Sequence, residues 1–116
     1  MKYALLIYGD EQAAAGATPE QFQAESDAYE VFTKSIIESG NFLDGDPFMP
    51  TSNSTSVQVR DGQTQTTSGP AATATPQLMA YYKVEAESPE HAVELAARIP
   101  GARHGTIEVR PIVQFD

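Results

Sequence analysis

The run from Tyr3 to Tyr8 constrains the fold most, because it is apolar on both of its alternating sets of side chains. The two sets are Tyr3, Leu5 and Ile7, and Ala4, Leu6 and Tyr8. Alternate side chains of a β-strand point to opposite faces of the sheet, so a strand of this kind must be covered on both sides. The run therefore predicts a central strand, and the fold must supply a layer against each of its faces.

The next segment predicts a loop followed by a long helix. Residues 9–17 are mostly small and are typical of a flexible loop. Thr18 can cap the helix, Pro19 suits its first position, and Gln21 completes a capping box. Gly40 is a natural stop for this helix. One helical face carries the residues expected in the core, which are Phe22, Tyr29, Phe32 and Ile36.

Residues 55–67 predict a β-hairpin, because the turn pair Asp61-Gly62 lies between two β-prone runs. A type I′ hairpin turn needs positive φ at both central positions, which aspartate and glycine tolerate. Because the hairpin is very polar, we expect it at the edge of a sheet. Residues 41–56 are rich in proline and polar side chains, so they predict irregular structure with a short strand near residues 42–43.

The last third of the chain predicts two strands separated by a second helix. The strands are expected over residues 78–85 and 105–113. Ser88-Pro89 repeats the capping device of the first helix, and Pro100-Gly101 ends the second one. The residues expected to face inward from this helix are Ala92, Leu95, Ala96 and Ile99.

These elements follow the order β, α, β-hairpin, β, α, β within a single domain of residues 1–116. They predict an α+β fold, a ferredoxin-like antiparallel sheet with two helices on one face. Two helices cover only one side of the sheet, so the doubly apolar first strand needs another layer. A second copy of the chain is the simplest source, and pairing two such sheets face to face gives a dimeric α+β barrel. We therefore predict a homodimer.

Composition excludes several classes of function. The chain has no cysteine and two histidines, so disulfides, thiolate metal sites and a closed zinc site are not expected. A net charge of −9 at pH 7 repels nucleic acid. Acidic residues interrupt the first apolar run, and no run is long enough for a membrane span, which indicates a cytoplasmic protein. Phosphate-binding and dinucleotide motifs are missing, and no cofactor is expected.

Four stretches of the chain resemble one protein family. They are Leu5 to Glu11, Val59 to Gly62, Gln77-Leu78 with Tyr81-Tyr82, and Ala102 to Pro111. In these stretches the chain resembles the DGPF-type branch of the YCII-related proteins, and the resemblance covers nearly its whole length. It implies a small bacterial domain with the architecture of a dimeric α+β barrel.

The motif that gives this branch its name is altered in this chain. Where the family has Asp-Gly-Pro-Phe, the chain has Ser68-Gly69-Pro70-Ala71, so the carboxylate and the aromatic ring are missing. On one interpretation the family's loop supplies a carboxylate to a pocket, and this chain has lost or changed that function. On the other, which we favour, Gly69-Pro70 sets the geometry of a turn and Ser68 bonds to nearby backbone.

Two residues are candidates for proton chemistry. His104 titrates near neutral pH and precedes the last strand, and Asp10 follows the first strand, where polar groups of binding sites are often found. In a cofactor-independent lyase, isomerase or oxygenase, His104 would be the base, Asp10 a second proton-transfer group and Tyr8 a hydrogen-bond donor. The alternatives are a surface histidine bonded to backbone and a solvated acid.

Further residues are candidates for ligand binding: Tyr8, Ser68, Tyr81, Tyr82, Arg103 and Glu108. Tyr81 and Tyr82 are consecutive, so one ring is expected in the helix-covered core and the other in the barrel or a pocket. Glu108 and Arg110 share a face of the last strand and are expected to pair with each other or with neighbouring strands. The alternative for the two tyrosines is core or interface packing, and the alternative for Glu108 and Arg110 is a solvent-facing position where they contribute little.

Three functions follow as hypotheses. The first is a module that binds a small neutral or cationic molecule or a regulatory partner, and the resemblance implies a link to extracytoplasmic-function sigma factors. The second is the cofactor-independent enzyme that uses His104 and Asp10, which rests on analogy of fold. The third is a purely structural interaction module whose barrel is filled by side chains.

Overall fold

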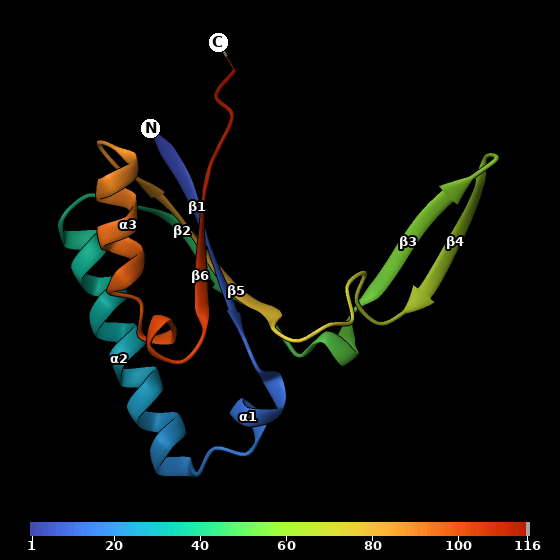
Figure 1. Cartoon of the computed structure of the whole chain (residues 1–116), viewed down its shortest axis with the longest axis horizontal. Helices are drawn as coiled ribbons and strands as arrows, with labels where there is room; N and C mark the ends of the chain where they lie inside the picture. Colours follow the sequence, from blue (N-terminus) through green and yellow to red (C-terminus); the bar gives the residue numbers. More distant parts are fainter. Residues whose placement is uncertain (116) are drawn as a thin grey trace.

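The computed structural model describes residues 1–115 and shows an α+β fold (Figure 1). A four-stranded antiparallel sheet has the strand order β2-β5-β1-β6. Its strands are β1 Lys2–Gly9, β2 Phe42–Pro47, β5 Gln77–Glu85 and β6 Thr106–Pro111. Two helices, α2 Pro19–Glu38 and α3 Pro89–Ala97, cover one face of this sheet. The predicted ferredoxin-like arrangement of helices on one sheet face is confirmed.

Strand β1 lies in the interior of the sheet, as its sequence predicts. Leu5 is opposite Tyr82 of β5 on one side and Val109 of β6 on the other. The side chains of β1 that face the helices are buried in the core, which comprises Tyr3, Leu5, Ile7, Phe32, Ile36, Tyr82, Val84, Ala86, Ala92, Leu95, Ala96 and Ile99. Burial of this apolar surface is the main favourable contribution to folding.

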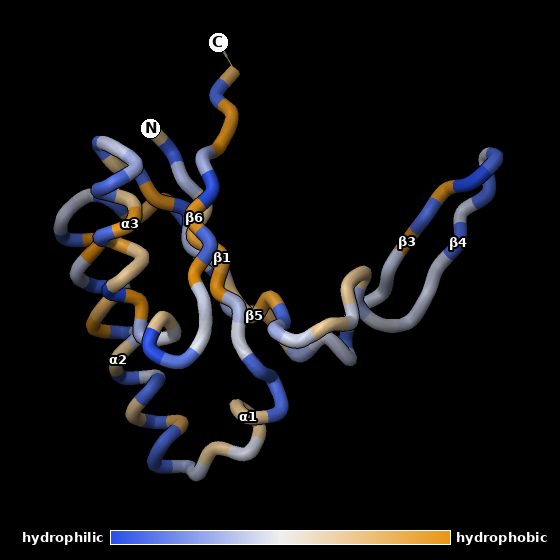
Figure 2. Tube along the Cα trace, in the orientation of Figure 1, coloured by the Kyte–Doolittle hydropathy of each residue, from blue (hydrophilic) through white to orange (hydrophobic). Residues whose placement is uncertain are grey.

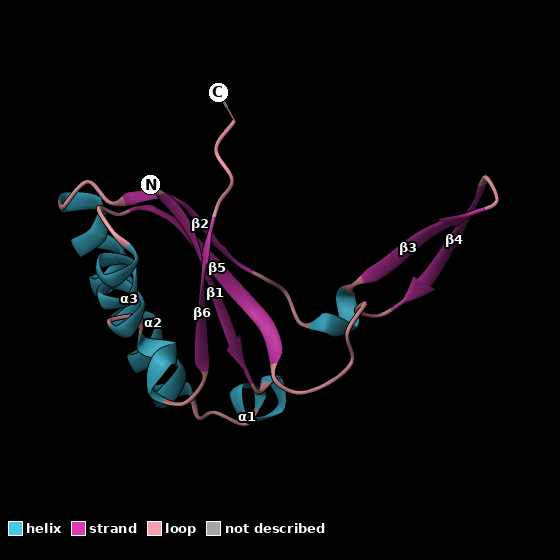
Figure 3. Ribbon diagram, turned by 45° about the horizontal axis from the view of Figure 1, so that its top comes forward, coloured by secondary structure: helices cyan, strands magenta, loops and turns pink. Residues whose placement is uncertain are grey.

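The other face of the sheet is not covered by the helices, and we call it the open face. Figure 3 shows both helices on one side of the sheet and no helix against the strands on the other. The second set of β1 side chains lies here and is only partly covered: Ala4, Leu6 and Tyr8. Strand β1 therefore has one fully buried face and one face with residual exposure.

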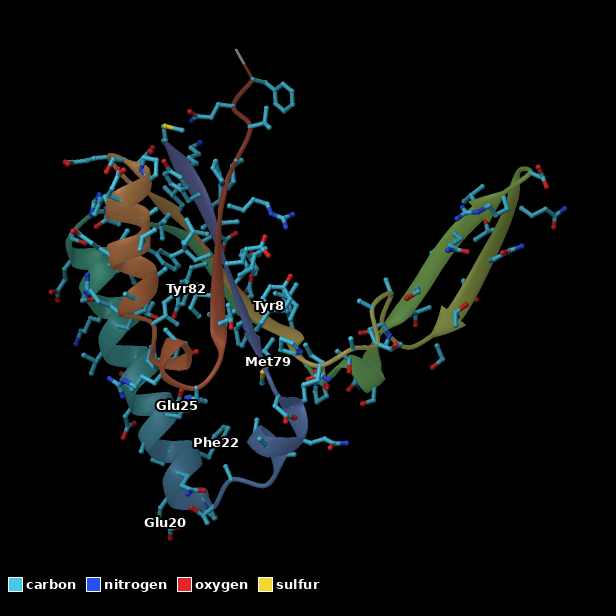
Figure 4. All side chains as sticks on the ribbon, in the orientation of Figure 1. Tyr8, Glu20, Phe22, Glu25, Met79 and Tyr82 are labelled. Carbon is cyan, nitrogen blue, oxygen red and sulfur yellow. The ribbon has the colours of Figure 1, made fainter. Side chains whose placement is uncertain are left out.

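Both predicted helix starts are confirmed. The Gln21 backbone N–H donates to Thr18 Oγ1 over 3.1 Å, and the Thr18 N–H donates to Gln21 Oε1 over 2.9 Å, which completes the capping box. At α3 the His91 N–H donates to Ser88 Oγ over 3.1 Å. One expected core residue is corrected: Phe22 is 67% exposed, because it lies on the first turns of α2, which extend past the end of the sheet (Figure 4).

Two segments are more regular than the sequence predicts. The expected loop after β1 contains a short helix, α1 Glu11–Ala15, whose first N–H groups are capped by Asp10: Oδ1 accepts from the N–H groups of Gln12 and Ala13. The expected irregular segment contains the whole strand β2, which forms an edge of the sheet. Pairing with β5 overrides its low intrinsic strand propensity.

The predicted hairpin is present, but its expected position is wrong. Strands β3 Thr55–Arg60 and β4 Gln63–Ser68 form a separate two-stranded sheet and do not join an edge of the larger one. The turn has the expected backbone, with φ of 51° at Asp61 and 75° at Gly62. In Figure 1 the hairpin projects away from the body on the side opposite the helices. A short 3₁₀ helix, η1 Thr51–Asn53, precedes it, and another, η2 Pro100–Arg103, precedes β6.

Within residues 1–115, none of the helices combines the length and the apolar character that crossing a lipid bilayer requires.

Candidate functional site

A hollow of about 790 Å³ lies where the base of the hairpin meets the end of the sheet. We call it the hairpin pocket. Its lining is Tyr8, Phe48, Met49, Thr51, Ser54, Thr55, Ser56, Val57, Gln58, Thr67, Pro70, Ala71, Ala72, Pro76, Gln77 and Leu78. None of these side chains is charged at pH 7, although the chain as a whole carries a net charge of −9. The pocket therefore combines apolar surface with neutral hydrogen-bonding groups.

The aromatic wall of the pocket is fixed by strand pairing and ring stacking. The Phe48 N–H donates to the Met79 carbonyl over 2.9 Å, which continues the pairing of β2 and β5 by one residue. The rings of Phe48 and Tyr81 are stacked, with centroids 5.8 Å apart and an interplanar angle of 24°. Phe48 is thus held between the pocket and the open face of the sheet.

The altered motif at residues 68–71 forms the turn that closes the hairpin base. Gly69 has φ of 108°, a conformation that glycine adopts without a steric penalty. Its N–H donates to the Ser54 carbonyl, and its carbonyl accepts from Ser56 Oγ, each over 2.8 Å. The geometry supports the interpretation that Gly69 and Pro70 set a turn. Ala71 lines the pocket with a small side chain.

Hydrogen bonds of Glu11 connect α1 to the floor of the pocket, and we call this connection the Glu11 strut. The Glu11 carboxylate accepts from the Thr51 N–H over 2.9 Å and from Thr51 Oγ1 over 2.8 Å. The Glu11 N–H in turn donates to Gln77 Oε1 over 3.0 Å. Sequence reasoning did not find this role for Glu11, because its partner Thr51 is forty residues away along the chain.

The two consecutive tyrosines divide between the faces of the sheet, as predicted. Tyr82 lies in the core, where its hydroxyl is 2.6 Å from Thr33 Oγ1 and burial raises its pKa. Tyr81 lies on the open face and donates to Asp46 Oδ2 over 2.9 Å. This hydrogen bond to a carboxylate is the main reason that the pKa of Tyr81 is raised to about 12. Glu108 and Arg110, also on the open face, form an ion pair.

The two candidates for proton chemistry lie in different surroundings. Asp10 caps α1, and His104 Nε2 lies 3.8 Å from Glu25 Oε1 of α2. Neither residue lines the hairpin pocket, and neither do Arg103, which ends η2, and Ser68, which ends β4. Of all the predicted site residues, Tyr8 alone contributes to the pocket lining. Figure 4 shows Tyr8 and Tyr82 on opposite sides of the sheet.

A second, more open hollow of about 610 Å³ lies beside the loop between β5 and α3. Its lining includes Glu85, Glu87 and His91, together with Met1, Ser39, Asn41 and Ala86. Glu85 is already paired with the Met1 ammonium, 2.5 Å away, and His91 Nδ1 accepts from the Glu87 N–H over 3.1 Å. Two of its polar side chains are thus already engaged within the chain, and the hollow is more open, so the hairpin pocket is the better candidate site. Among residues 1–115, no group of three or more potential ligands could hold a metal ion.

The fold and the site define a small ferredoxin-like module with an open sheet face and a neutral pocket at the base of a projecting hairpin. The chain belongs to the YCII-related domain family, whose model matches residues 1–116. It is also 25% identical over 117 residues to an uncharacterized protein of Rhizobium meliloti (strain 1021). That match covers 99% of this chain and 94% of the Rhizobium protein.

Proposed function

We propose that this protein binds a small, uncharged organic molecule in the hairpin pocket. The observation that carries the proposal is a hollow of about 790 Å³ without a charged side chain in its lining. This volume is in the range of roughly 300–1,000 Å³ that is typical of small-molecule sites. The proposal rests on the pocket itself.

The lining indicates the chemistry of the ligand. Phe48, Met49 and Leu78 offer apolar and aromatic surface, which favours a ligand with a hydrocarbon or ring portion. The hydroxyl of Thr51 and the amide of Gln77 are oriented by their bonds to neighbouring groups, so they hold fixed positions in the wall. A charged ligand would lose its bound water on entering the pocket and would gain no side chain of opposite charge from the lining. This transfer from water costs free energy.

The structure favours binding over proton-transfer catalysis at this place. Tyr8 is the one titratable side chain in the lining, and Asp10 and His104 lie elsewhere. Acid–base catalysis commonly needs a group whose pKa lies near the working pH. The catalytic roles of His104 and Asp10 stay predictions, and so does the partnership with a sigma factor, which a native pull-down tests directly.

We further propose that the protein is a homodimer. The partly exposed apolar residues Ala4 and Leu6 on the open face support this proposal, because a second copy would remove them from water. Native mass spectrometry under gentle ionisation distinguishes a dimer from a monomer and retains a bound ligand.

The same measurement tests the binding proposal. We expect a reproducible small-molecule adduct on the native protein, lost on denaturation. Ala71→Phe places a ring in the pocket lining and should abolish the adduct. Ala74→Phe is the matched control, since Ala74 is exposed and outside the lining, and it should keep the adduct. An adduct that survives in both variants would place the ligand elsewhere and refute the proposal.

A further inference from the structure

The hairpin of β3 and β4 has almost no partner within its own chain. Apart from Ser56, which is half-buried, every residue of the two strands is exposed. An isolated two-stranded hairpin is marginally stable in water, and its outer edges offer unpaired backbone groups. The hairpin therefore needs a surface that residues 1–115 of its own chain do not provide.

The two faces of the hairpin differ in composition. The strand register places Val57 opposite Thr66 and Val59 opposite Thr64, so one face is formed by β-branched side chains. The two valines are 60% and 58% exposed. In Figure 2 β3 carries apolar segments, whereas β4 is pale or hydrophilic along its length. The valine-bearing face, defined by Val57, Val59, Thr64 and Thr66, is the one that would gain most from contact.

The open face of the larger sheet is the complementary surface. The hairpin projects on the side of the sheet that faces away from α2 and α3 (Figures 1 and 3). A second copy placed against this open face would lie beside the hairpin. Ala4, Leu6 and Tyr8 would then meet the valine-bearing face. A two-fold axis makes the contact reciprocal, because each copy offers both the hairpin and the open face.

Charge decides which surfaces of two identical chains can meet. Helix α2 carries five acidic residues and one lysine, and α3 carries two acidic residues and no lysine or arginine. Two copies would repel each other through these helices. The hairpin has one arginine and one aspartate. On the open face Arg110 is paired with Glu108, and Lys83 is in register with Asp44, so these positive side chains lie beside acidic ones.

We propose that the β3–β4 hairpin of each copy lies on the open face of a second copy and closes the partner's hairpin pocket in the dimer. The closure of the pocket rests on the proposed binding function, whereas the exchange of hairpins does not. Val57 and Val59 are buried in this assembly, and the pocket loses its opening to solvent. The partner is a second copy of this chain, because the exposed valines of the hairpin and the partly exposed apolar residues of the open face would cover each other in a two-fold dimer.

Sedimentation velocity with paired variants tests the exchange. The wild-type protein should sediment as a dimer. Val57→Ser combined with Val59→Ser should weaken the dimer by at least about tenfold in Kd, because four valines leave the interface. The matched control is Val31→Ser with Val93→Ser, since these helix valines are 71% and 56% exposed, and it should leave the Kd unchanged. A wild-type monomer, or equal effects of both pairs, would overturn the proposal.

Cross-linking identifies the contact itself. A photo-reactive phenylalanine analogue at position 59 is introduced into unlabelled chains, which are refolded with ¹⁵N-labelled wild-type chains. Light-to-heavy cross-links should map to peptides of β1, β5 or β6. Cross-links within one chain, or to α2 and α3 of the other, would refute the exchange. Because this readout needs no ligand, a mapped contact with an empty pocket rejects the binding proposal alone.

Discussion

The body of this molecule, which is the four-stranded sheet with α2 and α3, and the β3–β4 hairpin contain similar apolar residues. These residues are buried in the body and exposed to water in the hairpin. In the body, Leu5 and Val84 are fully excluded from water by the helices. In the hairpin, Val57 and Val59 stay more than half exposed. Both regions have antiparallel strand pairing, so pairing alone does not distinguish them. The difference indicates that the body contributes most of the stability of the single chain, because its apolar side chains are buried. The exposed side chains of the hairpin are available for contacts with another molecule.

The largest expected effect comes from truncating the core. Leu5→Ala removes a fully buried side chain from the interior strand and should lower the free energy of unfolding by about 2–5 kcal/mol. Val57→Ala is the counterpart in the hairpin and should change the unfolding of the monomer by less than about 0.5 kcal/mol. Urea denaturation at low protein concentration measures both values. Equal losses would show that the hairpin contributes to the core of the single chain.

A second pair of variants compares glycines in the two regions. In the body, a Cβ at Gly105 would collide with the Tyr8 carbonyl oxygen, so Gly105→Ala should cost about 1–3 kcal/mol. In the hairpin turn, Gly62 has positive φ and open space around it, so Gly62→Ala strains the turn locally by about 1 kcal/mol.

Hydrogen exchange separates these two effects. Gly105→Ala should speed exchange throughout the body, because it lowers the global stability. Gly62→Ala should speed exchange in β3 and β4 and leave the amides of β1 and β5 unchanged. Faster exchange of the body in the Gly62 variant would contradict the independence of the two regions.

The sequence predicts local features of both regions better than the long-range arrangement of the strands, for a physical reason. Thr18, Ser88 and Asp61-Gly62 act through local hydrogen bonds and backbone preferences, so their helix starts and turn were predicted correctly. Strand β2 was largely missed, because its place depends on pairing with β5 more than thirty residues later. The direction in which the hairpin projects depends on the geometry of the connecting segments, which periodicity does not encode.

The candidate site shows the same contrast between features that are local in sequence and contacts that are distant in sequence. Tyr8 was a candidate because it lies at the end of the first strand, and the division of Tyr81 and Tyr82 between faces followed from alternation along a strand. Phe48, Met49 and the strut at Glu11 were missed, because they enter the site through contacts that are distant in sequence. The exposed pair Phe48-Met49, in a segment otherwise rich in polar residues, is the signal that could have indicated a binding surface.

A smaller effect is expected at the junction of the two regions. Glu11→Ala removes the carboxylate that accepts both bonds from Thr51, and it should cost about 1 kcal/mol. The Thr51 amide should then exchange faster, while the core amides of β1 keep their protection. Gln12→Ala, at an exposed position of the same short helix, is the control. An unchanged Thr51 amide in the Glu11 variant would show that the strut does not restrain η1.

The smallest expected effect is on the pH dependence of folding stability. It involves two tyrosines whose pKa values are raised to about 12 for different reasons. At Tyr29, in the body, the main cause is burial, whereas at Tyr81, on the open face, it is the hydrogen bond to Asp46. Both phenols keep their protons in the folded state above pH 10, where the unfolded chain begins to lose them. Folding stability should therefore fall as the pH rises from about 10 towards 12.

Asp46→Asn distinguishes the two causes. Without the carboxylate, Tyr81 should ionise at a lower pH than in the wild type, while Tyr29 should keep its raised pKa, because its burial is unchanged. An ultraviolet absorbance titration of tyrosinate, with Tyr81→Phe and Tyr29→Phe to assign each step, measures both. If the Tyr81 step stays in place in the Asn variant, a second cause holds its proton. Burial of the open face by another copy is such a cause, and dilution to the monomer would then remove it.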